Sequence, residues 1–260
     1  MTPPRKRSNS GERMTNEGSA VYDGGVIVNA GSAVCNDTVA AKQALRRAVT
    51  ARTRAFCADS EAARNASAAA CACVQSLHAF AEAAVVLAYM PMPTEIDCTA
   101  LIAAALARGK QVALPRVVRT RGKISVHELD FYVLAGGMAD ADRLMELLAA
   151  QTECGAYGIR EPKTALRQLE PGDCESIFGI VPGVAFTARG ARLGHGNGYY
   201  DRYLARLQRA AQSSSMAVTT CGLCFAAQLT DAVPCVRHDV LMDYVATERG
   251  ILRRTSPATD

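Results

Sequence analysis

Short apolar runs that alternate with helix-prone segments constrain the fold of this chain more than any other feature. The runs lie at residues 84–89, 111–118, 177–186, 217–225 and 241–247. The helix-prone segments lie at residues 37–56, 58–82, 97–108, 140–150 and 199–211. A further run at residues 124–129 alternates between apolar and polar, which is typical of a half-exposed strand. This alternation predicts an α/β fold with a single open, mainly parallel sheet flanked by helices.

The two ends of the chain differ in composition from this middle part. Residues 1–36 are rich in Gly, Ser, Asn and charged residues, so we expect a disordered, flexible N-terminal tail there, with one apolar patch at Val26–Val28. Asp37 is a suitable N-cap for the first helix. We therefore expect one domain over residues 37–250, followed by a flexible C-terminus over residues 251–260.

The composition argues against several classes of protein. The formal net charge is only +4, which is too small to indicate a nucleic-acid-binding or membrane-surface protein. No apolar stretch reaches the length of a membrane span. Ten cysteines, several of them inside apolar runs, indicate reduced thiols in a reducing compartment. The N-terminal residues lack the apolar core of a secretory signal, and the acids Glu12, Glu17 and Asp23 disfavour a mitochondrial presequence, so the cytosol is the expected location.

The segment from Arg189 to Tyr203 carries the candidate chemistry. It follows an apolar run, contains four glycines and leads into a helix. Glycines let the backbone approach a ligand closely, and the helix N-terminus adds the positive potential that suits a phosphate. Arg192 and His195 add donors, and Asp201 in the first helical turn can hold a hard cation beside the phosphates. The segment therefore predicts an anion-binding loop.

The glycines have other interpretations, as part of a known nucleotide-binding motif or as a tight turn. No Gly-Lys-Ser/Thr follows them, and they run as G-x-G-x-G, so this is neither a P-loop nor a dinucleotide-binding fingerprint. A tight surface turn without a ligand is the simplest alternative, but the charged residues around the glycines weigh against it. A second loop, Met90–Glu95, also follows a predicted buried strand, where ligands bind in open α/β sheets.

With these motifs in place, the chain resembles the 5-formyltetrahydrofolate cyclo-ligase family. The residues Val181–Phe186 (VPGVAF), Gly190 and Arg192–Asp201 (RLGHGNGYYD) resemble the signature of that family. Shorter matches follow the family's order, and the resemblance runs from residue 38 to residue 249. The shorter matches are Lys42–Arg46 (KQALR), Tyr89–Asp97 (YMPMPTEID), Leu114–Val117 (LPRV), Gly158–Pro162 (GIREP) and C-terminal blocks between Gly222 and Glu248.

The resemblance implies an enzyme, a ligase that uses ATP and Mg²⁺ to convert 5-formyltetrahydrofolate to 5,10-methenyltetrahydrofolate. It implies that the N5-formyl oxygen attacks the γ-phosphate of ATP to give an imino-phosphate, that N10 then closes the ring, and that ADP and phosphate are released. Such a reaction requires the protein to position the reactants and neutralise charge. The resemblance also implies a monomer whose partners are small-molecule substrates.

By position, the resemblance assigns four groups of site residues. The catalytic residues would be Arg192 and Tyr200. The ATP-binding residues would be Lys42, Gln43, Ala44, Leu45, Arg46, Arg192, Leu193, Gly194, His195, Gly196, Asn197, Gly198, Tyr199 and Tyr200. The folate-binding residues would be Met90, Glu95, His195, Gly196, Asn197, Gly198 and Tyr199. The Mg²⁺ ligands would be Asp201 and Asp243.

Several of these residues also have a structural interpretation. Lys42 and Arg46 share one helix face, which a solvated helix would also show. Glu95 suits the start of a helix, and Met90 suits a core. Asp243 falls in an apolar run, where a buried carboxylate without a partner is costly, so a functional role is favoured there.

The sequence also departs from the family, and other functions stay open. His195 and Asn197 stand where relatives commonly carry Arg and Gly or Lys, which predicts weaker or more pH-dependent phosphate binding. A catalytically weakened nucleotide- or folate-binding protein is therefore an alternative, as is another transferase or isomerase on a similar scaffold. The pattern Cys221-x-x-Cys224 with Cys235-x-x-His238 resembles a zinc site, but two cysteines at an odd separation in one strand point to opposite faces.

Overall fold

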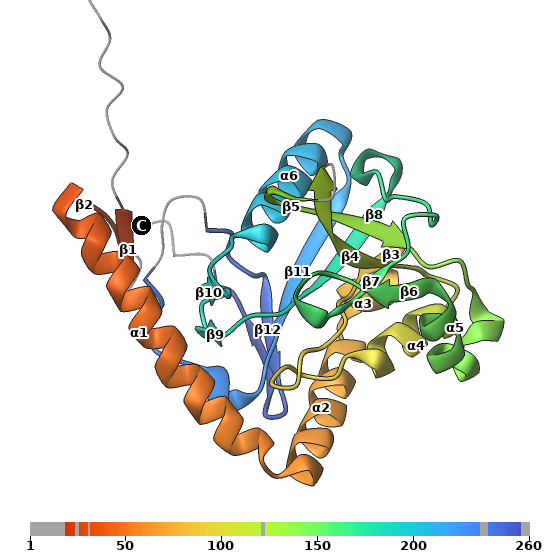
Figure 1. The fold of residues 1–260 in the computed structure, drawn as a ribbon, viewed down its shortest axis with the longest axis horizontal. Helices are drawn as coiled ribbons and strands as arrows, with labels where there is room; N and C mark the ends of the chain where they lie inside the picture. Colours follow the sequence, from red (N-terminus) through yellow and green to blue (C-terminus); the bar gives the residue numbers. More distant parts are fainter. Residues whose placement is uncertain (1–18, 24–25, 31, 121–122, 235–238, 256–260) are drawn as a thin grey trace, which may run out of the picture.

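A computed structural model describes residues 19–23, 26–30, 32–120, 123–234 and 239–255 of the chain (Figure 1). The α-helices are α1 (Ser32–Cys57), α2 (Ser60–Gln75), α3 (His78–Glu82), α4 (Thr99–Ala107), α5 (Leu144–Gln151) and α6 (Tyr199–Ser214). The 3₁₀ helices are η1 (Met138–Arg143), η2 (Ala156–Gly158), η3 (Pro171–Asp173) and η4 (Ala226–Gln228). The strands are β1 (Ser19–Asp23), β2 (Val26–Ala30), β3 (Val85–Leu87), β4 (Gln111–Thr120), β5 (Lys123–Val133), β6 (Thr152–Cys154), β7 (Arg160–Pro162), β8 (Ser176–Val181), β9 (Ala185–Phe186), β10 (Arg192–Leu193), β11 (Ala217–Leu223), β12 (Tyr244–Thr247) and β13 (Gly250–Arg253).

The centre of the molecule is a seven-stranded sheet in the order β13-β12-β11-β8-β3-β4-β5. The five inner strands are parallel to one another, while β13 and β5 run antiparallel to them at the two edges. In the middle of the sheet, Val86 of β3 pairs with Phe178 of β8 and with Val112 of β4. The predicted α/β fold with one open, mainly parallel sheet is confirmed.

The inner strands are buried on both faces, which explains their continuous apolar sequences. Val86 and Phe178 face the core that α2, α3 and α4 cover, whereas Val85 and Ile177 face the core that α6 covers. The two layers of helices lie on opposite sides of the sheet in Figure 1. The carboxyl ends of β3, β4 and β8 therefore lie at one edge of the sheet, between these layers.

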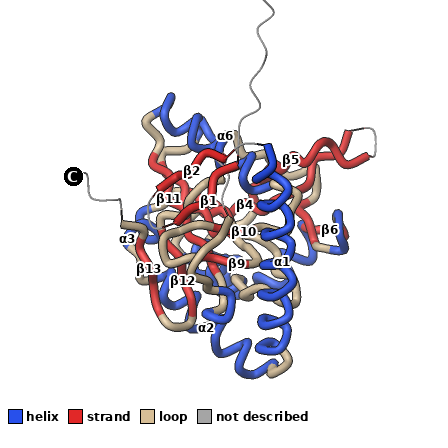
Figure 2. The backbone as a smooth tube through the Cα atoms, turned by 90° about the vertical axis from the view of Figure 1, so that its left-hand side faces the viewer, coloured by secondary structure: helices blue, strands red, loops and turns tan. Residues whose placement is uncertain are grey.

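Helix α1 lies apart from these layers and packs against the glycine-rich segment. Val49 of α1 packs with Val184, Ala185, Ala191 and Leu193, which come from the β9–β10 hairpin and its approach. In Figure 2, α1 runs along one side of the molecule beside β9 and β10. This packing places one face of α1 against the loop that the sequence predicts to bind an anion.

Several boundaries differ from the sequence expectations. Helix α1 begins at Ser32 rather than Asp37, and β1 pairs with β2 inside the expected tail. Residues 1–18 lie outside the described residues, so that part of the tail stays a prediction. The run at 177–186 is split after Val181, because Pro182 lacks a backbone donor for the sheet. Strand β13 crosses the expected domain end at residue 250.

No helix among the described residues is both long enough and apolar enough to span a bilayer.

Candidate active site

A cleft of about 880 Å³ opens at the carboxyl ends of β3, β4 and β8. This is the edge at which open α/β sheets bind ligands. One wall is α1, a second is the loop from Arg192 to Asp201, and a third is the loop after β3 that contains Glu95. A fourth wall is apolar and is formed by Pro115, Val117, Leu129 and Ile159. Both loops that the sequence singled out therefore line one cleft.

The glycine-rich loop owes its path to glycine at positions where other residues would not fit. Gly190 has a φ of 86°, and a Cβ atom there would collide with the carbonyl group of Met242. The Met242 amide donates a 2.8 Å hydrogen bond to the Gly190 carbonyl, so the segment before β12 lies against the loop. Gly196 also has a left-handed φ, of 115°. Glycine at 190 thus lets two loops distant in the sequence meet beside the cleft.

Arg192 is fixed deep in this cleft. Its Nη2 donates to Oδ1 of Asp201 at 2.7 Å, and its Nη1 donates to the carbonyl of Pro182 at 3.1 Å. Its guanidinium also lies over the ring of Tyr200, 5.6 Å from the centroid. The buried Nε has no hydrogen-bond partner among the described residues. Arg192 therefore brings a positive charge and an unused donor to the base of the loop.

Two more cations reach the cleft from α1. Lys42 Nζ lies 3.1 Å from Oδ2 of Asp239, and Arg46 Nε donates to the carbonyl of Gly194 at 2.8 Å. Burial lowers the pKa of Arg46, while the carboxylates of Asp201 and Asp239 raise it. An arginine stays charged in proteins, so this corner holds three cations against two carboxylates. That balance suits a polyanion with a bound divalent cation.

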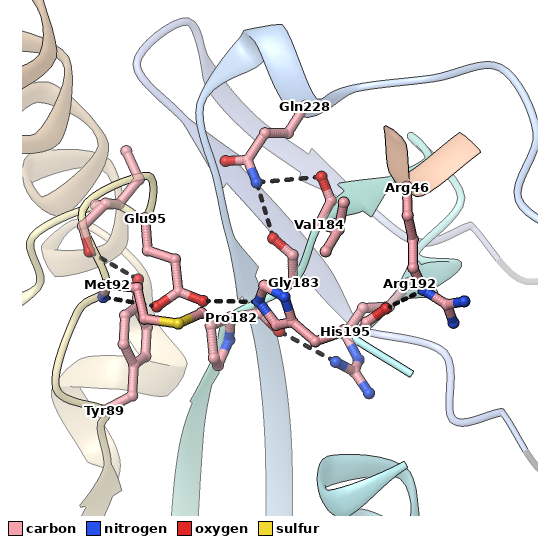
Figure 3. A network of polar contacts seen from close by, with 12 residues as sticks. Arg46, Tyr89, Met92, Glu95, Pro182, Gly183, Val184, Arg192, His195 and Gln228 are labelled. Atoms are coloured by element: carbon pink, nitrogen blue, oxygen red, sulfur yellow. Dashed lines mark hydrogen bonds and ion pairs between the residues drawn. The ribbon is translucent and has the colours of Figure 1, made fainter. Parts of the chain in front are cut away.

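Glu95 lies on the opposite wall. Its side chain is only 7 % exposed, and Oε2 accepts a 3.0 Å hydrogen bond from the amide of Met92. Oε1 lies 3.3 Å from Nε2 of His195, which reaches across from the glycine-rich loop (Figure 3). Beneath this turn, the buried Tyr89 hydroxyl donates to the carbonyl of Ile96 at 2.8 Å. A buried carboxylate with a fixed orientation is thus presented to the cleft.

Tyrosines line the glycine-rich loop and the rim of the cleft. The hydroxyls of Tyr199 and Tyr157 lie 3.1 Å apart. Burial, followed by this hydrogen bond, raises the pKa of Tyr199 to about 12. Burial also raises the pKa of Tyr200 strongly, so its phenol stays protonated and can donate a hydrogen bond. Tyr157 has a left-handed φ of 59° and stands exposed in η2.

Comparison with known proteins identifies the relatives of this chain. The model of the 5-formyltetrahydrofolate cyclo-ligase family matches residues 38–248. The chain belongs to this family. It is similar to the 5-formyltetrahydrofolate cyclo-ligase of Saccharomyces cerevisiae, with 30% identity over 216 residues that cover 82% of this chain and 97% of the relative. It is also similar to the enzyme of the same name from Mycolicibacterium smegmatis, with 32% identity over 64% of this chain and 75% of the relative.

Solved structures of cyclo-ligase relatives have the same fold. The structure of 5,10-methenyltetrahydrofolate synthetase from Aquifex aeolicus matches with a TM-score of 0.63 and 27% identity, over 84% of this chain and 95% of that one. A Mycoplasma pneumoniae 5,10-methenyltetrahydrofolate synthetase, at 18% identity and a TM-score of 0.55, supports the fold alone. The predicted family and ligase class are confirmed. The family match spans every residue of the cleft described above.

The structure brings most of the predicted cyclo-ligase site residues together. The cleft is lined by Lys42, Gln43, Arg46, Met90, Glu95 and all ten residues from Arg192 to Asp201. Ala44 and Leu45 do not line it; Ala44 is exposed and Leu45 packs against the core around Val49. Their contribution is to the helix that carries Lys42 and Arg46. The assigned roles stay predictions, but the residues occupy one site.

Asp243 differs from the others, because it does not line the cleft. Its Oδ2 accepts hydrogen bonds of 2.9 Å from both the amide and the hydroxyl of Thr220, and its Oδ1 accepts one of 3.0 Å from Arg254. It precedes β12 instead of lying within a strand. The sequence predicted a functional role because a buried carboxylate without a partner is costly. The Asp243 side chain is instead 35% exposed, and its bonds to Thr220 and Arg254 give it a structural role.

Among the cleft residues that the sequence did not predict are Asp239 and Tyr157. Asp239 lies in a C-terminal block that matched the family, but no pattern indicated that it faces α1. Tyr157 precedes the block Gly158–Pro162, and only the fold shows that this segment reaches Tyr199. The described residues contain no cluster of three or more His, Cys, Asp or Glu side chains suited to a metal. Asp201 and Asp239 both line the cleft, and Mg²⁺ is commonly held by one or two carboxylates together with substrate phosphates.

The zinc reading of the cysteines gains no support from the described part of the chain. Cys221 and Cys224 are both buried and free, and burial raises the pKa of the Cys221 thiol to about 12. A raised pKa disfavours the thiolate that would bind a metal. Cys235 and His238 lie outside the described residues.

Proposed function

We propose that this chain catalyses the ATP-dependent conversion of 5-formyltetrahydrofolate to 5,10-methenyltetrahydrofolate, with release of ADP and phosphate. The observation that carries the proposal is a single cleft in a cyclo-ligase fold, with three cations on one side and the buried carboxylate of Glu95 on the other. The names of the relatives give the two ends of the reaction, a 5-formyltetrahydrofolate ligase and a 5,10-methenyltetrahydrofolate synthetase.

The cationic side of the cleft would bind the triphosphate of ATP. Lys42 and Arg46 reach the cleft from α1, and Arg192 lies at the base of the glycine-rich loop. The glycines from Gly194 to Gly198 would allow the backbone to follow the phosphates. Preorganised donors of this kind stabilise the charge that develops on a transferring phosphoryl group. Arg192 would stabilise that charge from the base of the loop, since Asp201 and Pro182 fix the direction of its guanidinium.

Asp201 and Asp239 are the carboxylates that we propose for Mg²⁺. Both line the cleft, and both lie close enough to affect the pKa of Arg46. Each is paired with a cation in the structure, Asp201 with Arg192 and Asp239 with Lys42. Bound Mg²⁺ would neutralise phosphate oxygens between them. Asp243, with both oxygens bonded to Thr220 and Arg254, is the weaker candidate for the second ligand.

The folate would lie between Glu95 and the glycine-rich loop. The Glu95 carboxylate suits the amino and ring N–H donors of a pterin, because charge-assisted hydrogen bonds fix orientation. Its side chain is held by the Met92 amide, so it does not have to be ordered by the substrate. Met90 and the apolar wall around Val117 would cover the rest of the ligand.

This arrangement would support a two-step reaction. The N5-formyl oxygen forms a bond to the γ-phosphorus as the bond from phosphorus to ADP breaks, which gives an imino-phosphate. N10 then attacks the formyl carbon and gives up its proton to solvent, and the five-membered ring closes. The bond between that carbon and the phosphorylated oxygen breaks, so that phosphate leaves. The protonated phenol of Tyr200, whose ring lies under the Arg192 guanidinium, would donate a hydrogen bond to the reacting groups.

Ultraviolet absorbance tests the proposal. Purified protein is mixed with 5-formyltetrahydrofolate, with and without Mg-ATP, and the methenyl-folate band is followed. Growth of the band only with Mg-ATP, together with stoichiometric ADP and phosphate, is the expected result. Absence of the band would overturn the ligase function, and retained ATP or folate binding in that case would support the binding-protein alternative.

We also propose that the enzyme acts as a monomer in the cytosol. The cations and carboxylates that we assign to ATP and folate all line one cleft of this chain, which suits a monomer. The exposed Cys154 and the buried Cys71, Cys98, Cys221 and Cys224 are free thiols, which suits a reducing compartment. A mitochondrial relative in Arabidopsis thaliana shows that compartments differ within the family.

A further inference from the structure

The residue that distinguishes this glycine-rich loop, His195, contacts Glu95 across the cleft. Nε2 of His195 lies 3.3 Å from Oε1 of Glu95, although the residues are 100 positions apart. The His195 side chain is 53 % exposed and the Glu95 side chain only 7 %. In Figure 3 the imidazole points from the glycine-rich loop toward the carboxylate. The contact bridges the two sides of the cleft.

The surroundings of Glu95 make this contact important. The described residues contain no Lys or Arg that forms an ion pair with Glu95. Burial, with a smaller contribution from the Glu95 charge, raises the pKa values of Tyr89, Cys98 and Tyr200, which are therefore neutral neighbours. Among the described residues, only the Met92 amide and the His195 ring are hydrogen-bonded to the two carboxylate oxygens of Glu95. His195 is thus the one basic side chain in contact with a nearly buried negative charge in the described structure.

The two hydrogen bonds fix the Glu95 carboxylate but leave some of its acceptor positions open to a ligand. Each oxygen of an ionised carboxylate accepts about two hydrogen bonds, so one position on each oxygen stays available to a ligand. Met92 fixes Oε2 and His195 fixes Oε1, which sets the plane of the group. A pterin with two neighbouring N–H donors would meet a preorganised acceptor pair.

His195 is also tied to the phosphate side. It follows Gly194, whose carbonyl accepts a 2.8 Å hydrogen bond from Arg46 Nε, and it precedes Gly196, which has a φ of 115°. Arg46 lies in the corner assigned above to the triphosphate. The loop therefore has two anchors, Arg46 on the ATP side and Glu95 on the folate side.

We propose that His195 is a positioning residue for Glu95, so that it determines folate affinity more than ATP affinity. The inference rests on the proposed function and assigns to His195 a task different from direct contact with phosphates. Loss of the imidazole would leave Oε1 of Glu95 without its protein donor and the loop without its folate-side anchor. Phosphate binding would still be supported by Lys42, Arg46 and Arg192.

The test is a double-mutant cycle with His195→Ala, His195→Gln, Glu95→Gln and the double variant His195→Ala/Glu95→Gln. Calorimetry measures binding of 5-formyltetrahydrofolate without nucleotide and of Mg-ATP without folate, and steady-state rates give both KM values. His195→Ala should weaken folate binding about tenfold, as expected when a charged group loses a hydrogen bond. Mg-ATP binding should change less than about twofold. Glutamine keeps an amide donor, so His195→Gln should restore most of the folate affinity.

The double variant and a remote control complete the test. Adding His195→Ala to Glu95→Gln should cost little more than Glu95→Gln alone, because coupled residues are not additive. His78, which is exposed in α3, provides the matched control His78→Ala, which should change neither affinity. A larger loss for ATP than for folate, or additive effects in the double variant, would overturn the inference. Because the binding data do not need turnover, failure of the ligase reaction would be seen separately.

Discussion

Arg192 Nη2 and Asp201 Oδ1 form a 2.7 Å ion pair that joins the glycine-rich loop to the first turn of α6. The Arg192 side chain is 4 % exposed and that of Asp201 is 24 % exposed. Removing one partner of a buried pair leaves the other without compensation, so we expect the loss of either residue to lower both catalysis and stability. The pair also fixes the direction of the fork that we assign to the phosphoryl group.

Replacing Arg192 with Ala should lower kcat/KM by about 2–4 kcal/mol in transition-state free energy, the loss expected for one oxyanion-type donor. Arg192→Lys should recover only part of this, because an ammonium group lacks the planar fork that bonds Asp201 and Pro182 together. Kinetics with Mg-ATP and 5-formyltetrahydrofolate measure the effect, and thermal unfolding shows how much protein stays folded. An unchanged kcat/KM in folded Arg192→Ala would give the residue a structural role only.

The carboxylates that hold Mg²⁺ can be separated by comparing Asp201→Asn, Asp239→Asn and Asp243→Asn. Asp201→Asn and Asp239→Asn should raise the Mg²⁺ concentration needed for half-maximal rate, and Asp201→Asn should nearly abolish turnover. Both carboxylates line the cleft, so their loss removes oxygen ligands of the kind that Mg²⁺ prefers.

Asp243→Asn serves as the structural comparison in that series. It should lower the unfolding temperature, since Asp243 accepts bonds from Thr220 and Arg254, and leave the Mg²⁺ dependence unchanged. Mg²⁺ titrations of the initial rate at fixed ATP give the half-saturation values. A shift of the Mg²⁺ dependence in Asp243→Asn but not in Asp239→Asn would make Asp243 the second Mg²⁺ ligand, as the sequence predicts. It would contradict our assignment of Asp239.

The order of elements could be predicted from the sequence because the inner strands are buried on both faces. Runs such as 84–89 and 217–225 contain almost only apolar residues, which indicates burial whatever the tertiary contacts. Strands β6, β7 and β13 were missed because each has only three or four residues, too few to show an apolar pattern of their own. Likewise, the start of α1 at Ser32 has no capping signal as clear as Asp37.

The site was predictable where its residues are adjacent in sequence and not where the fold joins distant segments. The loop from Arg192 to Asp201 could be assigned because its glycines and charges lie together. Asp239 could not be distinguished from Asp243, because the choice depends on which carboxylate faces Lys42 and which faces Thr220. The contact between His195 and Glu95 likewise depends on two loops that the sheet brings together.

Buried thiols should make the protein less stable as the pH rises above 9. Burial raises the pKa of Cys71 and of Cys221 from 9.0 to about 12. In the unfolded chain these thiols lose their protons near pH 9, whereas in the folded chain they keep them until about pH 12. The stabilisation is therefore complete below pH 9 and is lost progressively between pH 9 and pH 12.

Urea unfolding at pH 8, 9 and 10 checks this expectation. Buried tyrosines such as Tyr200 also lose stabilisation near pH 10, equally in the wild type and in the cysteine variants, so the difference between variants isolates the thiol. The wild type should lose stability over this range, and Cys221→Ala should lose less because one ionising group is absent from its unfolded state. Cys154→Ala, which removes an exposed thiol, is the control and should follow the wild type. Equal slopes for Cys221→Ala and the wild type would show that the buried Cys221 thiol does not contribute.

Gln228 supports the active site from outside the cleft, and its removal should affect both stability and catalysis. The buried Nε2 donates to the carbonyls of Gly183 at 2.8 Å and Val184 at 3.2 Å, and Oε1 accepts from the Phe225 amide at 2.9 Å. These bonds hold the chain next to Pro182, whose carbonyl binds Arg192 (Figure 3). Gln228→Leu has a similar size but leaves buried polar groups unsatisfied, so the free energy of unfolding should fall by about 1–3 kcal/mol.

The catalytic effect of Gln228→Leu separates a supporting role for Arg192 from general destabilisation. If Gln228 acts through Pro182 and Arg192, kcat should fall in Gln228→Leu at temperatures where the variant is fully folded. The same change in an Arg192→Ala background should then have little further effect on kcat, because the group being positioned is already gone. Denaturation in urea and single-turnover rates measure the two quantities. A folded Gln228→Leu with the wild-type kcat would show that this network stabilises the fold without positioning Arg192.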